Sequence, residues 1–168
     1  MDINIDYVAN VLTELLNIPS PSGNTEMAIK FVEDKFNSIG IKNYRTNKGA
    51  LIGTIIGKDS SKEVTLSGHV DTLGGMVKEI KSNGRLKLTQ IGGYVWSTVE
   101  GEYVSIETLE GKKYTGTILT TAASSHVHGD ETEEVKRDKE NMEIRIDEKV
   151  SSVDEVLNLN FHIFLISF

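Results

Sequence analysis

Apolar positions near the N-terminus recur at the spacing of an amphipathic α-helix. They occupy one face of such a helix at Ile5, Val8, Leu12, Leu15 and Leu16. Pro19 and Pro21 end the pattern, because proline has no amide hydrogen to donate and also restricts the residue before it. The sequence therefore predicts a helix over residues 5–16 and a turn immediately after it.

A second helix is predicted after this turn. Asn24 or Thr25 can cap its N-terminus, and Glu26 places a negative charge in its first turn. Gly40 stands where helices commonly end in a left-handed residue. The side chains expected to face inward are Met27, Phe31, Phe36 and Ile39.

Short alternating runs follow and predict strands. Residues 41–46 and 50–57 flank a turn at Asn47-Lys48-Gly49, and residues 63–68 form a third run. Helices that alternate with strands are typical of an α/β fold. We therefore predict that residues 1–71 begin an α/β sheet.

The pattern changes near residue 72. Two pairs of alternating runs are joined by turns at Ser82-Asn83-Gly84 and Glu110-Gly111, and Asn-Gly is the dipeptide most typical of a tight β-hairpin. Short strands separated by glycine turns favour a small β-barrel or a sandwich. We predict that residues 72–150 form a β-rich domain, either inserted into the α/β part or separate from it.

The last part of the chain combines a helix signal with an apolar end. Ser152, followed three residues later by Glu155, predicts a capping box at the start of a short helix. Residues 161–168 are almost continuously apolar, whereas chain ends are usually polar and exposed. Two interpretations have equal support: a buried final strand, or a reading frame that has been cut or altered here.

Composition and charge narrow the range of partners. The net charge of −7 argues against nucleic-acid binding, which needs a basic face. The chain has no cysteine, hence no disulfide and no thiolate nucleophile. No stretch approaches the ~20 apolar residues of a membrane span, and the acidic N-terminus lacks the basic region of an export signal. We expect a cytoplasmic protein with no nucleic-acid and no membrane partner.

One short stretch carries candidate chemistry. In Gly68-His69-Val70-Asp71, a histidine and an aspartate stand two positions apart at the end of a predicted strand. Side chains at this spacing point to the same side, so Asp71 can orient the His69 imidazole or bind beside it. Functional groups of α/β folds gather at the carboxyl ends of strands. Taken alone, the motif fits a metal site or, more commonly, a hydrogen-bonded pair with no further role.

Several stretches taken together, in order, are more specific. They are Leu16–Gly23 (LNIPSPSG), Gly68–Asp71 followed by Gly74, Met76–Ile80 (MVKEI), Ile91–Gly93 and Glu143–Asp147 (EIRID). On these stretches the chain resembles the dinuclear-metal aminopeptidase family, which includes glutamyl, deblocking and tetrahedral (TET) aminopeptidases and proteins labelled cellulase M-like. The resemblance covers nearly the whole chain up to about Leu159. It implies a zinc-peptidase α/β domain interrupted by an inserted, barrel-like, β-rich dimerisation domain.

The resemblance assigns roles to two residues. His69 corresponds to the first metal ligand, and Asp71 to the catalytic-site acid that holds this histidine in place. The implied cofactors are two divalent metal ions, zinc or cobalt, which activate a water while a glutamate shuttles the proton. Thr72 stands where many members of the family have a glutamate.

The rest of the implied site is not found in this sequence. The remaining ligands, the Glu-Glu pair with the catalytic base and the last histidine would follow the inserted domain, where residues 160–163 (NFHI) do not match the family. Catalytic zinc ordinarily has at least three protein ligands. We therefore expect a truncated chain that binds metal weakly or not at all and is inactive alone. The expected domains are an incomplete α/β domain over 1–71, the β-rich domain over 72–150, and a short helix with an apolar tail over 151–168.

Two further clusters are interpreted as surface features. Residues 131–137 (ETEEVKR) look like the Glu-Glu-Val of the family, but Lys136 and Arg137 replace the glycine turn that follows it there, so a solvated charged segment is expected. His126 and His128 could bind metal, yet we expect them on the surface of the inserted domain. His162 receives no role.

Three hypotheses for function remain. The first is a truncated metal-dependent aminopeptidase, a hydrolase that in complete form cleaves N-terminal residues from peptide substrates. The second is an interaction module that forms homo-oligomers, or pairs with intact relatives, through its β domain. The third, a carbohydrate hydrolase, is disfavoured because no paired carboxylates stand in a convincing setting. An unfinished sheet also predicts association and incomplete burial of Leu12, Leu16, Phe31 and Phe36.

Overall fold

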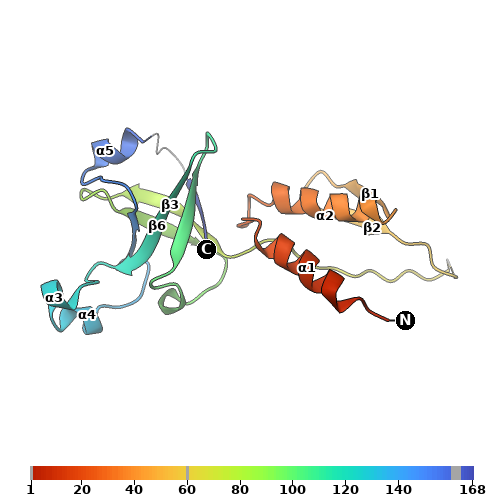
Figure 1. Cartoon of the computed structure of the whole chain (residues 1–168), viewed down its shortest axis with the longest axis horizontal. Coiled ribbons are helices and arrows are strands. Elements are labelled where there is room, and N and C mark those ends of the chain that lie inside the picture. The colour runs from red at the N-terminus through yellow and green to blue at the C-terminus, as the bar shows by residue number, and fades with distance from the viewer. Residues whose placement is uncertain (1, 60, 160–163) are drawn as a thin grey trace. The chain divides into compact units, whose positions relative to one another are not determined.

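The computed structural model describes residues 2–59, 61–159 and 164–168. The chain divides into two compact units, Met1–Thr72 and Leu73–Phe168 (Figure 1). The first unit contains two helices and a hairpin, and the second is a β-barrel with short helices. Among the residues described, no helix is long and apolar enough to cross a membrane.

The first predicted helix is present as α1 (Ile5–Leu16). Asn4 caps it, because its side-chain oxygen accepts a hydrogen bond from the Tyr7 amide at 3.0 Å. After the helix, Pro21 forms an isolated parallel bridge with Thr72. This contact joins the loop between α1 and α2 to the C-terminal end of the first unit.

The second predicted helix is α2 (Glu26–Ser38), with Thr25 at its N-cap. Its C-terminal end has the bonding of a Schellman motif. The Ile41 amide donates to the Phe36 carbonyl at 2.9 Å, and the Gly40 amide donates to the Asn37 carbonyl at 3.1 Å. Gly40 has a φ of +75°, which a residue with a side chain rarely adopts. The predicted place of Gly40 just beyond the helix is confirmed.

A two-stranded hairpin follows, as predicted. β1 (Lys42–Arg45) and β2 (Leu51–Thr54) pair in antiparallel fashion, with Arg45 opposite Leu51. The Arg45 guanidinium also forms ion pairs with Glu26 and, at 2.8 Å, with Glu33. Because both glutamates belong to α2, these pairs fasten the hairpin to that helix.

The third predicted strand, residues 63–68, is wrong. Residues 62–71 form no strand, and the side chains of Val64 and Leu66 are 87% and 93% exposed. A strand requires a neighbour to satisfy its backbone donors and acceptors, and β1 and β2 make up the whole sheet seen in the described part of this unit. The alternating sequence therefore gives an extended segment without a partner. Two helices and one hairpin are the α/β structure that the first unit shows.

Little apolar surface is buried in the first unit. Ala28 is the one buried residue within the two helices. Leu12 and Leu16 are more than half exposed, and Phe31 and Phe36 are partly buried, so the expected incomplete burial is confirmed.

Two of the side chains expected to face inward do not. Met27 and Ile39 are both mostly exposed, so this part of the prediction is wrong. Helical spacing identifies an apolar face, but a face is buried only where another element packs on it. On α2, Ala28 is buried in this way, whereas the side chains of Met27 and Ile39 remain exposed to solvent.

The second unit is a closed barrel of six strands (Figure 1). Around the barrel the order is β3-β4-β7-β6-β5-β8, and every pairing is antiparallel. A barrel rather than a sandwich is therefore the correct alternative for the β-rich part. The strands are β3 (Gly74–Ile80), β4 (Leu86–Ile91), β5 (Tyr103–Thr108), β6 (Lys113–Thr120), β7 (Met142–Ile146) and β8 (Phe164–Ser167).

Glycine turns join the two predicted hairpins. Between β3 and β4, Gly84 has a φ of +76°, and the Asn83 side chain accepts a hydrogen bond from the Arg85 amide at 3.1 Å. Between β5 and β6, Gly111 has a φ of +78°. Both turns lie where the sequence predicted them, because left-handed backbone is a local property of glycine.

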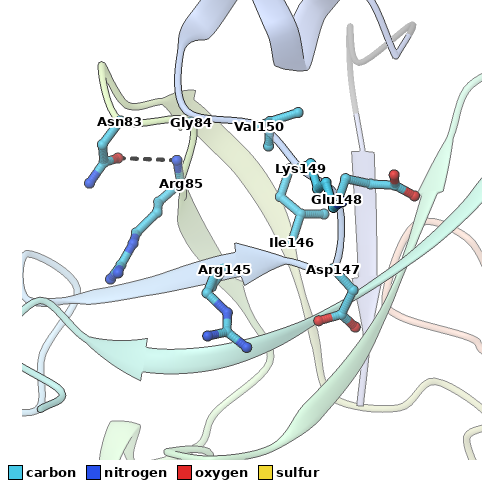
Figure 2. A pocket seen from close by; sticks show the side chains of 9 residues that line it. All are labelled: Asn83, Gly84, Arg85, Arg145, Ile146, Asp147, Glu148, Lys149 and Val150. Carbon is cyan, nitrogen blue, oxygen red and sulfur yellow. Dashed lines mark hydrogen bonds between the residues drawn. The ribbon is translucent and has the colours of Figure 1, made fainter.

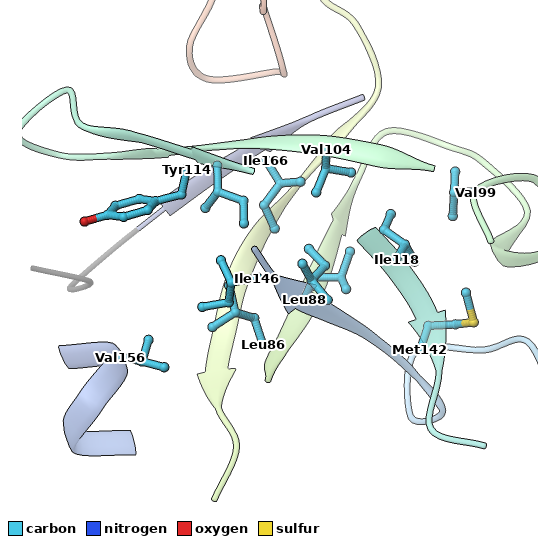
Figure 3. Close-up of a cluster of buried hydrophobic side chains, with 12 residues drawn as sticks. Leu86, Leu88, Val99, Val104, Tyr114, Ile118, Met142, Ile146, Val156 and Ile166 are labelled. Atoms are coloured by element: carbon cyan, nitrogen blue, oxygen red, sulfur yellow. The ribbon is translucent and has the colours of Figure 1, made fainter. Parts of the chain in front are cut away.

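Aliphatic side chains fill the barrel (Figure 3). Alternate residues of β5 and β6 point inward, so Val104, Ile106 and Ile118 are buried while their neighbours are not. Gly116 lets β6 and β7 approach closely, since a Cβ there would lie 2.7 Å from the Arg145 carbonyl oxygen. The barrel thus has a continuous apolar core of its own.

The apolar end of the chain closes this barrel. β8 lies between β3 and β5, and its Ile166 is fully buried opposite Gly75 and Ile106. Of the two interpretations of the tail, residues 164–168 fit a buried final strand. Phe161 and His162 lie outside the described residues.

Short helices complete the second unit. α5 (Val153–Leu157) begins with the predicted capping box, in which the Ser152 hydroxyl accepts from the Glu155 amide at 3.3 Å. The Glu155 carboxylate accepts from the Ser151 amide at 2.6 Å, one residue earlier than in the usual motif. Val156 is fully buried against the barrel core. The other short helices are η1 (Trp96–Thr98), α3 (Ser125–His128) and α4 (Glu131–Glu134).

A buried carboxylate ties the β3–β4 hairpin to β7. Glu143 is 2% exposed and forms ion pairs with both Lys81 and Arg85. A buried charge is tolerated only when it is paired and hydrogen-bonded, and Glu143 has a cation on each carboxylate oxygen. Removing one partner would leave a partly compensated charge inside the protein.

A second carboxylate lies on the barrel surface. Asp147 accepts hydrogen bonds from the Tyr103 hydroxyl at 2.5 Å and the Thr115 hydroxyl at 2.7 Å. The Tyr103 bond, followed by the Thr115 bond, holds the pKa of Asp147 below its ordinary value. These bonds connect the end of β7 with β5 and β6.

Truncating the core should destabilise the barrel strongly. We expect Leu86→Ala, at a fully buried position, to lower the free energy of unfolding by about 2–5 kcal/mol, because it leaves a cavity. The matched variant Leu109→Ala, at an exposed position, should change it by less than about 0.5 kcal/mol. Denaturant unfolding followed by the fluorescence of Trp96, the only tryptophan, measures both. Equal effects would contradict the described core.

Removing the Tyr103 hydroxyl should change the pH dependence of stability. A lowered folded-state pKa contributes stability that is present above the ordinary carboxyl pKa and lost as pH falls through the folded value. Wild type should therefore exceed Tyr103→Phe in stability at pH 7, and the difference should shrink below about pH 4. NMR titration should show the pKa of Asp147 rising in the variant. Tyr44→Phe, at an exposed tyrosine of the first unit, serves as control.

Candidate metal site

His69 and Asp71 lie together, as the spacing predicted. Nδ1 of His69 is 3.0 Å from Oδ1 of Asp71 and 3.2 Å from the Asp71 carbonyl oxygen. Both oxygens can only accept, so Nδ1 carries the proton and Nε2 keeps the lone pair that can bind a metal. The His69 side chain is 83% exposed, which leaves the ring open to a ligand. A histidine oriented by a carboxylate in this way is the usual arrangement at metal sites.

Ser22 holds Asp71 from the other side. Its hydroxyl donates to Oδ2 of Asp71 at 2.5 Å. This bond is the main reason that the pKa of Asp71 lies below its ordinary value; partial burial opposes the effect, and the neighbouring His69 adds to it. Asp71 is therefore a carboxylate at neutral pH, with one oxygen for Ser22 and one for His69.

The backbone of this motif is fixed by the loop between α1 and α2. Ser20 is fully buried, and its hydroxyl donates to the Val70 carbonyl at 2.7 Å. Its own carbonyl accepts from the Thr72 amide at 2.9 Å. Residues 70–72 are thus held in place although they belong to no sheet.

Sequence reasoning missed both serines as positioning residues. One signal was available, the Ser-Pro-Ser spacing of Ser20, Pro21 and Ser22 within a stretch that resembles the family. No local pattern, however, says which distant segment such hydroxyls will reach. Their partners lie 49 and 50 positions further along the chain.

His69 and Asp71 do not complete a metal site. Within residues 2–59, 61–159 and 164–168, no group of three or more histidine, cysteine, aspartate or glutamate side chains could hold an ion. A catalytic zinc needs about three protein ligands. The pair therefore has the chemistry of a single oriented ligand.

The two clusters that the sequence suggested as surface features lie on short helices of the second unit. His128 in α3 is 3.5 Å from a carboxylate oxygen of Glu131, and α3 and α4 contain no buried residue. Arg137 pairs with Glu100 at 2.8 Å. The expectation of a solvated charged segment over residues 131–137 agrees with these contacts. His162 lies outside the described residues.

A hollow of about 510 Å³ lies on the second unit (Figure 2). Its walls come from the β3–β4 turn and from the end of β7, including Arg145 and Asp147. Neither His69 nor Asp71 lines it. The hollow therefore contains none of the residues to which the sequence assigned chemistry.

Sequence comparison identifies relatives over most of the chain. The family described as M42 glutamyl aminopeptidase matches residues 49–164, which include His69 and Asp71. A Bacillus subtilis (strain 168) protein named aminopeptidase YhfE is 49% identical over 140 residues. The matched region is 83% of this chain but 40% of YhfE, so the chain spans less than half the length of this relative.

Structural comparison finds the same fold. The TET aminopeptidase of the marine sediment archaeon Thaumarchaeota archaeon SCGC AB-539-E09 matches with a TM-score of 0.80 at 20% identity, over 96% of this chain and 44% of that one. The Pyrococcus horikoshii TET1 peptidase, described as able to assemble into a tetrahedron or a large octahedral shell, matches with a TM-score of 0.66 at 21% identity. The match to the TET1 peptidase covers 95% of this chain and 46% of the TET1 chain. Because the family match spans well over half of its 168 residues, the chain belongs to the M42 glutamyl aminopeptidase family.

Proposed function

We propose that this chain supplies His69 as one ligand in the active site of a metal-dependent aminopeptidase. Such an enzyme removes N-terminal residues from peptides. The observation that carries the proposal is the His69–Asp71 pair, oriented by Ser22, in a chain that belongs to the M42 family. The name of YhfE, at 49% identity, supports the same class of reaction.

Each residue of the pair has a distinct proposed part. His69 Nε2 binds one of two divalent cations, zinc or cobalt. When bound, such cations activate a water and polarise the scissile carbonyl. Asp71 acts through His69: its carboxylate keeps the proton on Nδ1 and fixes the direction of the ring. Ser22 keeps Asp71 ionised and in place.

Taken alone, the chain is proposed to be inactive. The described residues supply one oriented ligand, and the relatives are more than twice as long as the region matched. We propose that the other ligands and the catalytic glutamate correspond to the part of the relatives that this chain does not match. The chain spans less than half the length of these relatives.

The second candidate is an interaction module. The barrel has a core of its own, whereas the helices of the first unit bury one residue, so the barrel is the part suited to act independently. The assembly described for the Pyrococcus horikoshii peptidase supports association through such a fold. This alternative proposes homo-oligomers formed through the barrel. Under either candidate function, we propose that the protein is cytoplasmic.

Zinc should bind weakly to the chain alone. Because one imidazole supplies little affinity, we expect calorimetric titration to detect either no binding or a weak site that His69→Ala removes. His126→Ala, at an exposed histidine of α3, is the matched control and should change nothing. Tight, stoichiometric zinc that survives dialysis would contradict the view that this chain supplies only one metal ligand.

Completing the chain should restore hydrolysis. In a chimera in which this chain replaces the matched part of YhfE, we expect hydrolysis of aminoacyl-anilide substrates with added zinc or cobalt. His69→Ala should abolish it, and Asp71→Ala or Ser22→Ala should lower metal affinity or activity about 10–100-fold, since both act through His69. His126→Ala should leave activity unchanged. A folded chimera that never hydrolyses these substrates, or that is indifferent to His69→Ala, would overturn the proposed function.

A further inference from the structure

One arginine of the barrel has no charged partner among the residues that the structure describes. The chain contains four arginines, and three of them each form an ion pair with a glutamate: Arg45, Arg85 and Arg137. The fourth, Arg145 on β7, is exposed, and its guanidinium forms no ion pair and no hydrogen bond within the described ranges. Water can hydrate an exposed guanidinium, so the surroundings of Arg145 decide whether it belongs to a site.

A carboxylate with an unused oxygen lies two positions further along the chain. The hydroxyls of Tyr103 and Thr115 both donate to Oδ2 of Asp147, and no group in the described part of the chain donates to Oδ1. Both bonds lower the pKa of Asp147, so this side chain is charged at neutral pH. They also direct the carboxylate toward β5 and β6, and Arg145 acts on it from a distance rather than through an ion pair.

Arg145 and Asp147 project from the same side of the chain. The residue between them, Ile146, is buried in the barrel core, and side chains alternate along an extended segment. Figure 2 shows both side chains on one side of β7, where they line the hollow of about 510 Å³. The wall of the hollow therefore presents a cation and an anion that do not contact each other.

A second guanidinium reinforces the positive end of this wall. Leu86 of β4 pairs with Ile144 of β7, so the next positions in this antiparallel register place Arg85 opposite Arg145. Like charges opposite each other on neighbouring strands repel. Glu143 binds one nitrogen of Arg85, which offsets part of this repulsion. A carboxylate bound between the two arginines would offset the rest.

We propose that the hollow binds a short zwitterion of the dipeptide class, with its carboxylate on Arg145 beside Arg85 and its ammonium group on Oδ1 of Asp147. Guanidinium groups bind carboxylates through paired hydrogen bonds. Residues two positions apart on an extended chain are about 7 Å apart, and two extended residues of a ligand span about the same distance. The two charges of a dipeptide thus have the spacing of the two charges on the wall.

The composition of the wall favours a zwitterion over a simple anion. Besides Arg85 and Arg145 it contains Lys149, but it also contains Asp147 and Glu148. A phosphate held by the arginines would meet the Asp147 carboxylate, and the net charge of −7 also repels anions from the molecule. The volume lies within the 300–1,000 Å³ that is usual for small-molecule sites.

The first experiment asks whether both charges of the ligand are needed. The full chain, free of added metal, is titrated with glycylglycine while its amide resonances are followed by NMR. We expect saturable shifts at residues 83–85 and 145–150. N-acetyl-glycylglycine lacks the ammonium group and glycylglycine amide lacks the carboxylate, so each should bind at least about 10-fold more weakly. No saturable shift, or equal binding of either analogue or of inorganic phosphate, would overturn the proposal.

Substitutions then test the two ends of the wall. Arg145→Gln and Asp147→Asn should each weaken glycylglycine binding at least about 10-fold. Arg145 is exposed and its guanidinium has no described partner, so Arg145→Gln should keep the wild-type circular dichroism spectrum even if Asp147→Asn disturbs the barrel. Lys113→Gln, at an exposed cation of β6 outside the hollow, is the matched control and should bind like wild type. Wild-type affinity in a folded Arg145→Gln variant would overturn the proposal.

One further variant separates this site from the candidate metal site. The hollow contains neither His69 nor Asp71, so the proposal does not rest on the proposed aminopeptidase function. His69→Ala should leave glycylglycine binding unchanged. If His69→Ala abolished binding, or if the shifts appeared around residues 69–71 instead, the peptide would occupy the candidate metal site and the inference would be wrong.

Discussion

Pairing of β8 with both β3 and β5 is the constraint on which the second unit depends. With β8 in place, the six strands form a ring without an open edge, and Ile166 completes the apolar core. The last residues of the sequence thus pair with strands that begin as far back as Gly74 and Tyr103. Within residues 2–59 and 61–72, the first unit has no comparable closure. Its hairpin has open edges, and its helices share one buried residue.

This contrast explains which features could be predicted from the sequence. The helices, the glycine turns at Gly84 and Gly111, and the capping box of α5 depend on neighbours a few positions away, and each is where the sequence placed it. The strand at 63–68 and the inward positions of Met27 and Ile39 depend on distant elements, and there the prediction fails. Periodicity reports which face is apolar but not whether anything covers it.

The candidate site follows the same division. His69 and Asp71 are two positions apart, so their contact could be read from spacing alone. Ser22 and Ser20 reach the motif from a different part of the chain, and no rule of spacing connects them to it. The contact between His69 and Asp71 was therefore predictable, while the residues that fix its geometry were not. The lowered pKa of Asp71 depends mainly on Ser22, one of the two serines that the sequence did not reveal as positioning residues.

The contacts of Ser20 and Ser22 also close a loop. They join segments 49 and 50 positions apart, and α2 with the β1–β2 hairpin lies between them. Closing a loop of this length has an entropic cost that local contacts do not have, so these bonds should form late in folding and open early in fluctuations. A ligand that requires the oriented His69 binds only the closed loop. It would therefore slow the opening of the whole enclosed segment, and the state of a single imidazole would be transmitted to a helix and a hairpin that it does not touch.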